Sequence, residues 1–482
     1  MTTSRVPADQ APAIDLDAAA SFNLGWIWTI SLTAALGGLL FGYDWVVIGG
    51  AEPFYKVYFH LRSSAAEGWA MSSALPGCML GALASAFLSD RFGRQRLLIA
   101  AAAHFAGSSV GTALAGTFNT FIANRLLGGV AIGLASNLSP LYIAEIAPAR
   151  LRGTLVSVNQ LTIVIGILLA QAVNMMIAQP VPADASAADI LASWNGQFGW
   201  RWMFGATTVP ALFFLAAMFI VPESPRWLAK QGLLARSHGV LARVGGPAYA
   251  GASLVEIRES LERDADRGDI RELAAPGIRG VLVLGIVLAV FQQWCGINVI
   301  FNYGVKIFAS AGYTISGSLF SIVVTGAANL LATFVAIGTV DRLGRRFLML
   351  AGSAGLAIIY MLIGLSYLAG SQGTHVLFLA VAAIACYACS LAPVTWVVLS
   401  EIFPNRVRGA ALSLAVLALW VACFILTITF PILIEQLGFT GTFWLYAVIC
   451  ALGFVYIFHR LPETKRKSLE EIEAQLTLGP RH

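Results

Sequence analysis

Charged residues are scarce in this chain of 482 residues: Asp, Glu, Lys and Arg make up 11%, whereas apolar types make up 58%. A soluble domain usually carries about 25% charged residues. This scarcity excludes an ordinary water-soluble protein and indicates that most of the chain is built to lie in lipid. The net charge of +5 implies no nucleic-acid partner.

Cysteine is also rare. The six cysteines all lie in apolar stretches, where a thiol behaves as a small hydrophobe: Cys78, Cys295, Cys386, Cys389, Cys423 and Cys450. One pair forms a C-x-x-C pattern, but with no His or third Cys nearby it indicates packing rather than a metal site or a redox centre. Because the apolar segments also lack a nucleophile–base pair and a phosphate loop, we expect neither an enzyme nor a cofactor, with no metal.

The first 20 residues are polar and net acidic, so they lack the basic-then-apolar pattern of a cleaved secretory signal. Long apolar runs follow, each close to the ~20 residues that a helix needs to cross a bilayer. An all-α integral membrane protein is therefore expected. Twelve transmembrane helices are predicted, at 26–50, 68–89, 97–116, 119–143, 156–178, 202–221, 280–305, 316–339, 347–369, 375–399, 410–434 and 440–459.

Most Lys and Arg residues near the spans fall on alternate connections of this pattern: Arg91, Arg94, Arg96, Arg150, Arg152, Arg226, Lys230, Arg342, Arg345, Arg346, Arg406, Arg408, Lys465, Arg466 and Lys467. Basic residues near span ends face the cytoplasm. The opposite connections hold few, notably Lys56 and Arg62. The pattern predicts a multi-pass protein of the cell (inner) membrane, in contact with the lipid bilayer and with both termini cytoplasmic.

Motifs in the first half recur in the same order in the second. Asp90-Arg-Phe-Gly-Arg94 recurs as Asp341-Arg-Leu-Gly-Arg345, Glu145-Ile-Ala-Pro as Glu401-Ile-Phe-Pro, and Pro222-Glu-Ser as Pro462-Glu-Thr. This duplication predicts two pseudo-symmetric six-helix bundles with cytoplasmic helices and a substrate site between them near the midplane. The predicted organisation is a cytoplasmic N-terminal tail (1–25), a first bundle (26–221), an intracellular helical linker (222–278), a second bundle (279–460) and a cytoplasmic C-terminal tail (461–482).

Two segments outside the bundles carry a helix-start pattern. Ser253 and Glu256 have capping-box spacing, which predicts that a short amphipathic helix begins there, and Ser468 and Glu471 repeat the spacing in the C-terminal tail. Such helices lie either in a solvated linker or beneath both bundles, where they would latch them together.

The chain resembles the sugar porter family of the major facilitator superfamily, most closely its bacterial proton-linked symporters. The resemblance runs from Gly37-Gly-Leu-Leu-Phe-Gly-Tyr-Asp44 to Pro462-Glu-Thr-Lys465, and its most specific pieces are Pro222-Glu-Ser-Pro-Arg-Trp-Leu228 and Gln292-Gln-Trp-Cys-Gly-Ile-Asn298. It implies a secondary active transporter that carries a monosaccharide, a pentose or hexose, by alternating access and works as a monomer.

Asp44 is a candidate for proton coupling, because it lies deep in the first span and an ionisable group there usually has a partner and a function. Arg125, a few residues into the fourth span, is its natural counter-ion. If the Arg moves away, the carboxylate is left in an apolar setting that favours the protonated form. A permanent ion pair that fixes helix packing is the alternative. The resemblance implies proton symport, because passive facilitators of the animal type have Asn at this place.

A sugar hydroxyl both donates and accepts hydrogen bonds, and so do amide side chains. The resemblance assigns sugar binding to Gln160, Gln292, Gln293, Asn298 and Asn329, with Phe41, Trp396 and Trp420 as apolar walls. Singly, each of these amides could instead join helices. Because Gln293 and Asn298 would point about 140° apart on a regular helix, Gly296 is predicted to mark an unwound turn. The family pattern is not followed at Asn302, Ala392 and Leu419. These departures leave the identity of the transported sugar open.

The repeated motifs supply charges for a cytoplasmic gate: Asp90, Arg91, Arg94, Glu145, Arg152, Glu223, Asp341, Arg342, Arg345, Glu401, Arg408 and Glu463. Single exposed ion pairs contribute about 0–1 kcal/mol, so a cooperating network is required to bias a conformational equilibrium. The orientation rule alone explains the side on which the Arg residues lie, but not their repeated spacing with acids. Two other functions stay open at this point, namely a passive facilitator and a sugar sensor without transport.

Overall fold

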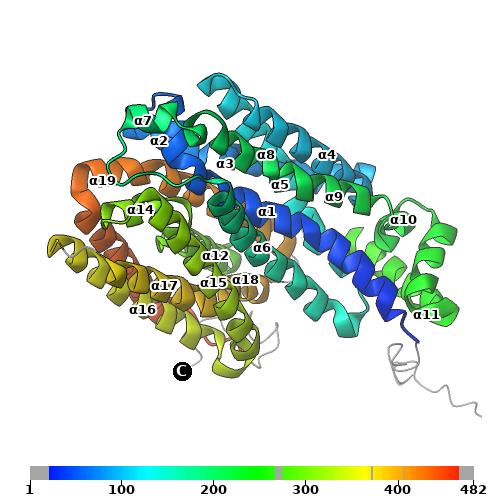
Figure 1. Cartoon of the computed structure of the whole chain (residues 1–482). Helices are drawn as coiled ribbons and strands as arrows, with labels where there is room; N and C mark the ends of the chain where they lie inside the picture. The colour runs from blue at the N-terminus through cyan, green and yellow to red at the C-terminus, as the bar shows by residue number, and fades with distance from the viewer. Residues whose placement is uncertain (1–20, 266–272, 274, 371–372, 405–406, 466–482) are drawn as a thin grey trace, which may run out of the picture.

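The computed structural model describes residues 21–265, 273, 275–370, 373–404 and 407–465, except for the side chains of 263–265, 276–277, 337 and 340–341. Every regular element in this described part is a helix. Figure 1 shows a first half, coloured blue to green, packed beside a second half, coloured green to red.

The first half comprises α1 (Leu24–Tyr58), α2 (Ser64–Ser72), α3 (Ala74–Phe92), α4 (Arg94–Ala113), α5 (Phe118–Ile146), α6 (Ala149–Ile177), α7 (Ala187–Ala192), η1 (Asn195–Gly199), α8 (Trp200–Ala206) and α9 (Thr208–Met218). The second half comprises α12 (Pro276–Trp294), α13 (Ile297–Asn302), α14 (Gly304–Ser310), α15 (Ile315–Leu343), α16 (Arg345–Leu368), α17 (Thr374–Cys389), α18 (Leu391–Ile402) and α19 (Arg408–Arg460).

Among the described residues, ten helical stretches are long and apolar enough to cross a membrane. The last of them, α19, supplies two passes, because Gly438 breaks it with φ 66°. The remaining pass, third in chain order, is α4. Its 20 residues begin with Arg94 and include Ser108 and Ser109, which lower its hydropathy. The twelve predicted spans are therefore all present. Several are divided, as where α2 gives way to α3 and α17 to α18.

The segment between the halves contains α10 (Pro225–Lys230) and α11 (Leu234–Ala265). The predicted helix start at Ser253 is wrong, because Ser253 lies inside α11. The break falls earlier, at Gly246 with φ 87°, and Pro247 follows it in the first turn, where its fixed φ suits a helix. The second predicted start, at Ser468, lies outside the described residues.

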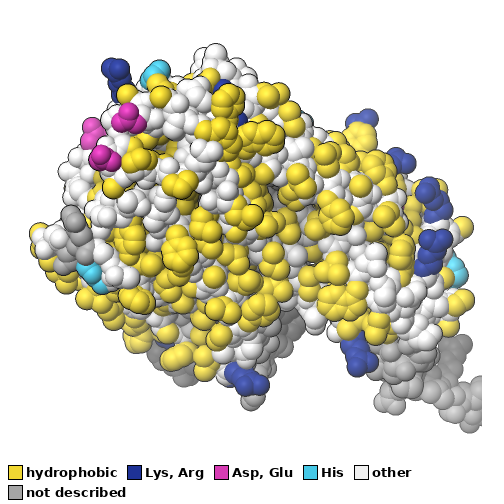
Figure 2. All heavy atoms as spheres, in the orientation of Figure 1, with side chains coloured by type: hydrophobic (Ala, Val, Ile, Leu, Met, Phe, Trp, Pro, Cys, Tyr) yellow, Lys and Arg dark blue, Asp and Glu magenta, His cyan; other side chains and the backbone are white. Residues whose placement is uncertain are grey.

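The end of the helices that carries Arg94 and Arg345 is called the basic end here, and the opposite end the far end. Helix α1 starts at the basic end, where the Asn23 N–H donates to the Val244 carbonyl of α11 (2.9 Å). In Figure 2, hydrophobic side chains cover the middle of the visible face, and Lys and Arg side chains gather at the right, over the linker helices. This distribution suits a helix bundle that lies in lipid.

Several contacts between the halves lie toward the far end. A Cβ on Gly49 of α1 would lie 2.3 Å from the Asn302 carbonyl oxygen, and one on Gly68 of α2 the same distance from that of Ile428. The Val181 N–H donates to the Ser316 hydroxyl (3.3 Å). The halves are thus closely packed at the far end.

Candidate functional site

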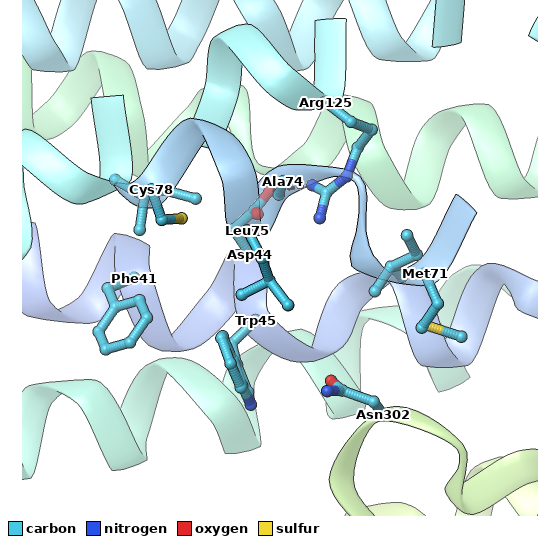
Figure 3. Close-up of a pocket in the computed structure, with 11 residues that line it drawn as sticks. Phe41, Asp44, Trp45, Met71, Ala74, Leu75, Cys78, Arg125 and Asn302 are labelled. Atoms are coloured by element: carbon cyan, nitrogen blue, oxygen red, sulfur yellow. Dashed lines mark hydrogen bonds and ion pairs between the residues drawn. The ribbon is translucent and has the colours of Figure 1, made fainter. Parts of the chain in front are cut away.

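Asp44 and Arg125 form a buried ion pair between α1 and α5. Arg125 Nη1 lies 2.5 Å from Asp44 Oδ1, and the two residues are 4% and 5% exposed. The guanidinium carbon also lies 5.5 Å from the centre of the Phe204 ring, within cation–π range. The predicted partnership is present, and Figure 3 shows Arg125 reaching from its helix toward Asp44.

The ion pair lines a small cavity that is partly open to solvent. Its walls come mainly from the first half, including Met71 of α2 and Cys78 of α3. Asn302 of α13 closes it from the second half, and its Oδ1 is buried with no hydrogen-bond partner among the described residues. A charged pair, a free amide oxygen and apolar walls therefore meet where the two halves join (Figure 3).

Three aromatic rings join the halves beside this cavity. The ring centres of Phe41 and Trp45 on α1 lie 5.8 Å apart, and each lies about as far from Trp420 of α19, at 5.9 and 6.2 Å. Such spacings favour edge-on aromatic contacts. The sequence predicted Phe41 and Trp420 as apolar walls of the site. It did not predict Trp45, although Trp45 directly follows Asp44.

A chain of buried amides runs across the break in the seventh span. Gln292 Nε2 donates to the Tyr387 hydroxyl (2.6 Å), and Gln293 Nε2 donates to Gln292 Oε1 (2.6 Å). Asn298 Nδ2 in turn donates to Gln293 Oε1. The chain exists because Gly296 has φ 87° between α12 and α13, which confirms the predicted unwound turn. Only Gly adopts this conformation without a steric penalty.

The other predicted sugar contacts lie apart from this chain. Asn329 of α15 is buried, whereas Gln160 of α6 is exposed and Trp396 of α18 is 42% exposed. Among the described residues, no hydrogen bond joins any of the three side chains to the amide chain. The structure therefore brings together only part of the predicted set.

The basic end of the first half holds a compact polar network. Arg94 Nη2 lies 3.0 Å from Glu145 Oε1, and the Ser224 hydroxyl donates to Glu145 Oε2 (2.5 Å). Glu223 Oε1 accepts from the backbone N–H of Arg94 (2.9 Å), so it caps the start of α4, where a negative charge is stabilised. Asp90 pairs with Lys230 of the linker at 2.8 Å.

The second half repeats this arrangement. Arg345 Nη2 lies 3.2 Å from Glu401 Oε1, and the Thr464 hydroxyl donates to Glu401 Oε2 (2.6 Å). Glu463 Oε1 accepts from the backbone N–H of Arg345 (3.0 Å) and so caps the start of α16. The sequence repeat is thus also a repeat of contacts.

Each network links helices within its own half, together with the segment that follows that half. Arg91, Arg152 and Arg342 are exposed, and Arg408 Nε donates to the Phe403 carbonyl (3.2 Å). The side chain of Asp341 lies outside the described ones. Arg94 is only 7% exposed, so its pair with Glu145 differs from the exposed pairs that were expected.

A charged cluster at the far end escaped the sequence reasoning. Lys56 Nζ lies 2.6 Å from Glu67 Oε2 and 3.6 Å from Glu52 Oε1. Lys306 of α14 binds the other oxygen of Glu67. Because Glu67 is in the first half and Lys306 in the second, this ion pair crosses between the halves. One signal was available, since Lys56 departs from the charge pattern of the connections.

The chain matches proteins of known activity along most of its length. The family model described as "Sugar (and other) transporter" matches residues 30–476. The D-xylose-proton symporter of Escherichia coli (strain K12) is 39% identical, with 94% of this chain and 96% of that protein covered. The arabinose-proton symporter of Bacillus subtilis (strain 168) is also 39% identical, with the same coverage.

Solved structures of the E. coli xylose transporter also match. Its inward-open conformation gives a TM-score of 0.82 at 37% identity, over 93% of this chain and 99% of that chain. The structure with bound 6-bromo-6-deoxy-D-glucose gives 0.77 at 38% identity, over 94% and 100%. Both matches therefore extend over nearly the whole chain.

Proposed function

The chain belongs to the family of sugar (and other) transporters, and we propose that it is a secondary active transporter that carries a pentose or hexose together with a proton. Its relatives are transporters and not enzymes. The first sugars to test are D-xylose and arabinose, because two relatives are named as symporters of these sugars.

One observation carries the coupling proposal: the buried Asp44–Arg125 pair faces a cavity that the two halves share. While the guanidinium stays in place, the carboxylate has a charged partner. A helix movement that withdraws Arg125 leaves a carboxylate in an apolar wall, which favours proton binding. Protonation and helix arrangement therefore depend on each other. One charge crossing 100 mV releases about 2.3 kcal/mol, enough for accumulation of about fifty-fold.

The sugar site in this proposal lies between the halves. Gln292, Gln293 and Asn298 supply amides that both donate and accept, and Asn329 and Gln160 add further amides from α15 and α6. The aromatic rings Phe41, Trp45, Trp396 and Trp420 supply apolar surfaces for the C–H faces of a sugar. A bound sugar would exchange hydrogen bonds with the amide chain.

The proposed orientation places the basic end in the cytoplasm. Lys and Arg concentrate there, as the positive-inside rule requires, and both termini would then be cytoplasmic. In this orientation the far end, where the two halves are closely packed, faces the outside, so the structure is closed on that side. The paired networks around Glu145 and Glu401 link helices within each half at this end. Closure of the cytoplasmic gate would therefore require further contacts between the two halves. The transporter is proposed to act as a monomer.

Uptake into proteoliposomes tests the coupling. The purified protein should accumulate D-xylose or another sugar of a pentose, hexose and polyol panel when a proton gradient is applied. Asp44→Asn should abolish accumulation and retain counterflow exchange, because the amide cannot carry the proton but still fits the site. Equal accumulation by the variant would reject symport. Wild-type protein that equilibrates sugar without accumulating it would identify a passive facilitator, and binding without any transport would identify a sensor.

A further inference from the structure

Gln171 on α6 is a buried amide whose polar atoms have no hydrogen-bond partner among the described residues. Its side chain is 1% exposed, and the atoms left without a partner there are Nε2 and Oε1. Buried polar groups in folded proteins nearly always have partners, because an unpaired amide destabilises the conformation that buries it. The unpaired amide therefore points to another state in which it is satisfied.

Gln171 faces the other half of the protein. A Cβ on Gly326 of α15 would lie 1.9 Å from Gln171 Oε1 and 3.1 Å from its Cδ, so the amide rests directly on the opposing helix backbone. Asn174, one turn further along α6, differs. Its Nδ2 donates to the Val47 carbonyl of α1 (2.9 Å), within the same half.

Helix geometry places Gln171 on the pathway between the halves. It follows Gln160 by 11 residues, which is three turns of about 3.6 residues, so both amides lie on one face of α6, about 16 Å apart. On α15, Gly326 and Asn329 are three residues apart and also share a face. Gln160 lies nearer the basic end, and Gln171 lies where the halves are packed together.

We propose that Gln171 is a substrate-contacting residue in the far-end part of the pathway, where it hydrogen-bonds a sugar hydroxyl once that end opens. Separation of α6 from α15 uncovers the amide in the conformation that admits solute from the far side. An amide suits this role because it can donate to and accept from the same hydroxyl. The inference rests on the proposed sugar transport.

The test compares KM on the two sides of the membrane. D-Xylose uptake by intact cells reports the far side in the proposed orientation, and uptake by inside-out vesicles reports the basic side. Gln171→Leu should raise the far-side KM about tenfold, the effect of one hydrogen bond, and change the basic-side KM less than twofold. Leu168→Met is the matched control, because Leu168 also contacts the Gly326 position but offers no hydrogen bond.

The 2-deoxy, 3-deoxy and 4-deoxy analogues of D-xylose separate a contact from a shift in conformation. If Gln171 binds one hydroxyl, the substitution should leave the far-side KM of the analogue that lacks it unchanged. An equal rise for all sugars, or an unchanged far-side KM, overturns the proposal. Gln171→Met replaces Gln171→Leu if the latter fails to fold. Failure of the wild-type protein to transport any panel sugar would instead refute the proposed function.

Discussion

At the residue scale, glycines determine how closely α1 approaches α6 and therefore where Asp44 lies. A Cβ on Gly42 would lie 1.9 Å from the Ile163 carbonyl oxygen, and one on Gly166 would lie 2.1 Å from that of Leu39. Membrane helices lack a hydrophobic drive to associate, so small residues that allow such backbone contact matter more than in water. The position of the buried carboxylate follows from this packing.

Gly42→Ala should therefore destabilise the protein. The new methyl group has no space against the backbone of α6, and overpacking of this kind costs about 1–3 kcal/mol. The measurement is the midpoint of thermal unfolding in detergent. Gly107→Ala is the control, because a Cβ at Gly107 of α4 meets nothing within 4 Å. Equal midpoints for the two variants would show that the α1–α6 approach is not tight.

At the element scale, the break at Gly296 aligns the amide chain. Gln293 precedes the break and Asn298 follows it, yet their side chains are hydrogen-bonded. A Cβ on Gly296 would also lie 2.8 Å from Cγ of Tyr446, so backbone conformation and packing both select glycine there.

Gly296→Ala should weaken sugar binding about tenfold, because a left-handed Ala costs roughly 1–2 kcal/mol and relief of that strain rotates α13 away from α12. Equilibrium binding of D-xylose to the purified variant measures the effect. Gly280→Ala in the preceding helix α12 should bind normally, since a Cβ there meets nothing within 4 Å. Normal affinity in Gly296→Ala would remove the amide chain from the proposed site.

Local sequence patterns predicted the helices of this fold more readily than the breaks within them. Long apolar runs predicted the twelve passes, and the cost of a buried charge led directly from Asp44 to Arg125. The capping pattern at Ser253 misled, because Gly246 and Pro247 set the helix start instead. The ion pair between Lys306 and Glu67 had no such local signal. Lys306 and Glu67 are 239 residues apart in the sequence, and only the packed halves bring them together.

At the scale of the whole molecule, charge distinguishes the two ends. The networks of the basic end, around Glu145 and Glu401, tie helices within each half. At the far end, Lys306 joins the halves by binding Glu67, whereas Lys56 binds the same carboxylate from within the first half. Opening of the far end must separate α14 from α2. This movement breaks the Lys306–Glu67 ion pair but leaves the Lys56–Glu67 ion pair intact.

Lys306→Met should therefore favour the conformation open at the far end. A hydrogen bond to a charged group contributes about 1.5–3 kcal/mol, so the equilibrium should shift at least tenfold. Met71 is a suitable reporter position, because it lines the cavity and is 4% exposed. In intact cells, a membrane-impermeant maleimide should label Met71→Cys faster when Lys306→Met is also present. Lys56→Met removes the same charge from the same carboxylate within one half, and it should leave the labelling rate unchanged. Similar acceleration by both substitutions would mean that charge at Glu67, rather than a link between the halves, keeps this end closed.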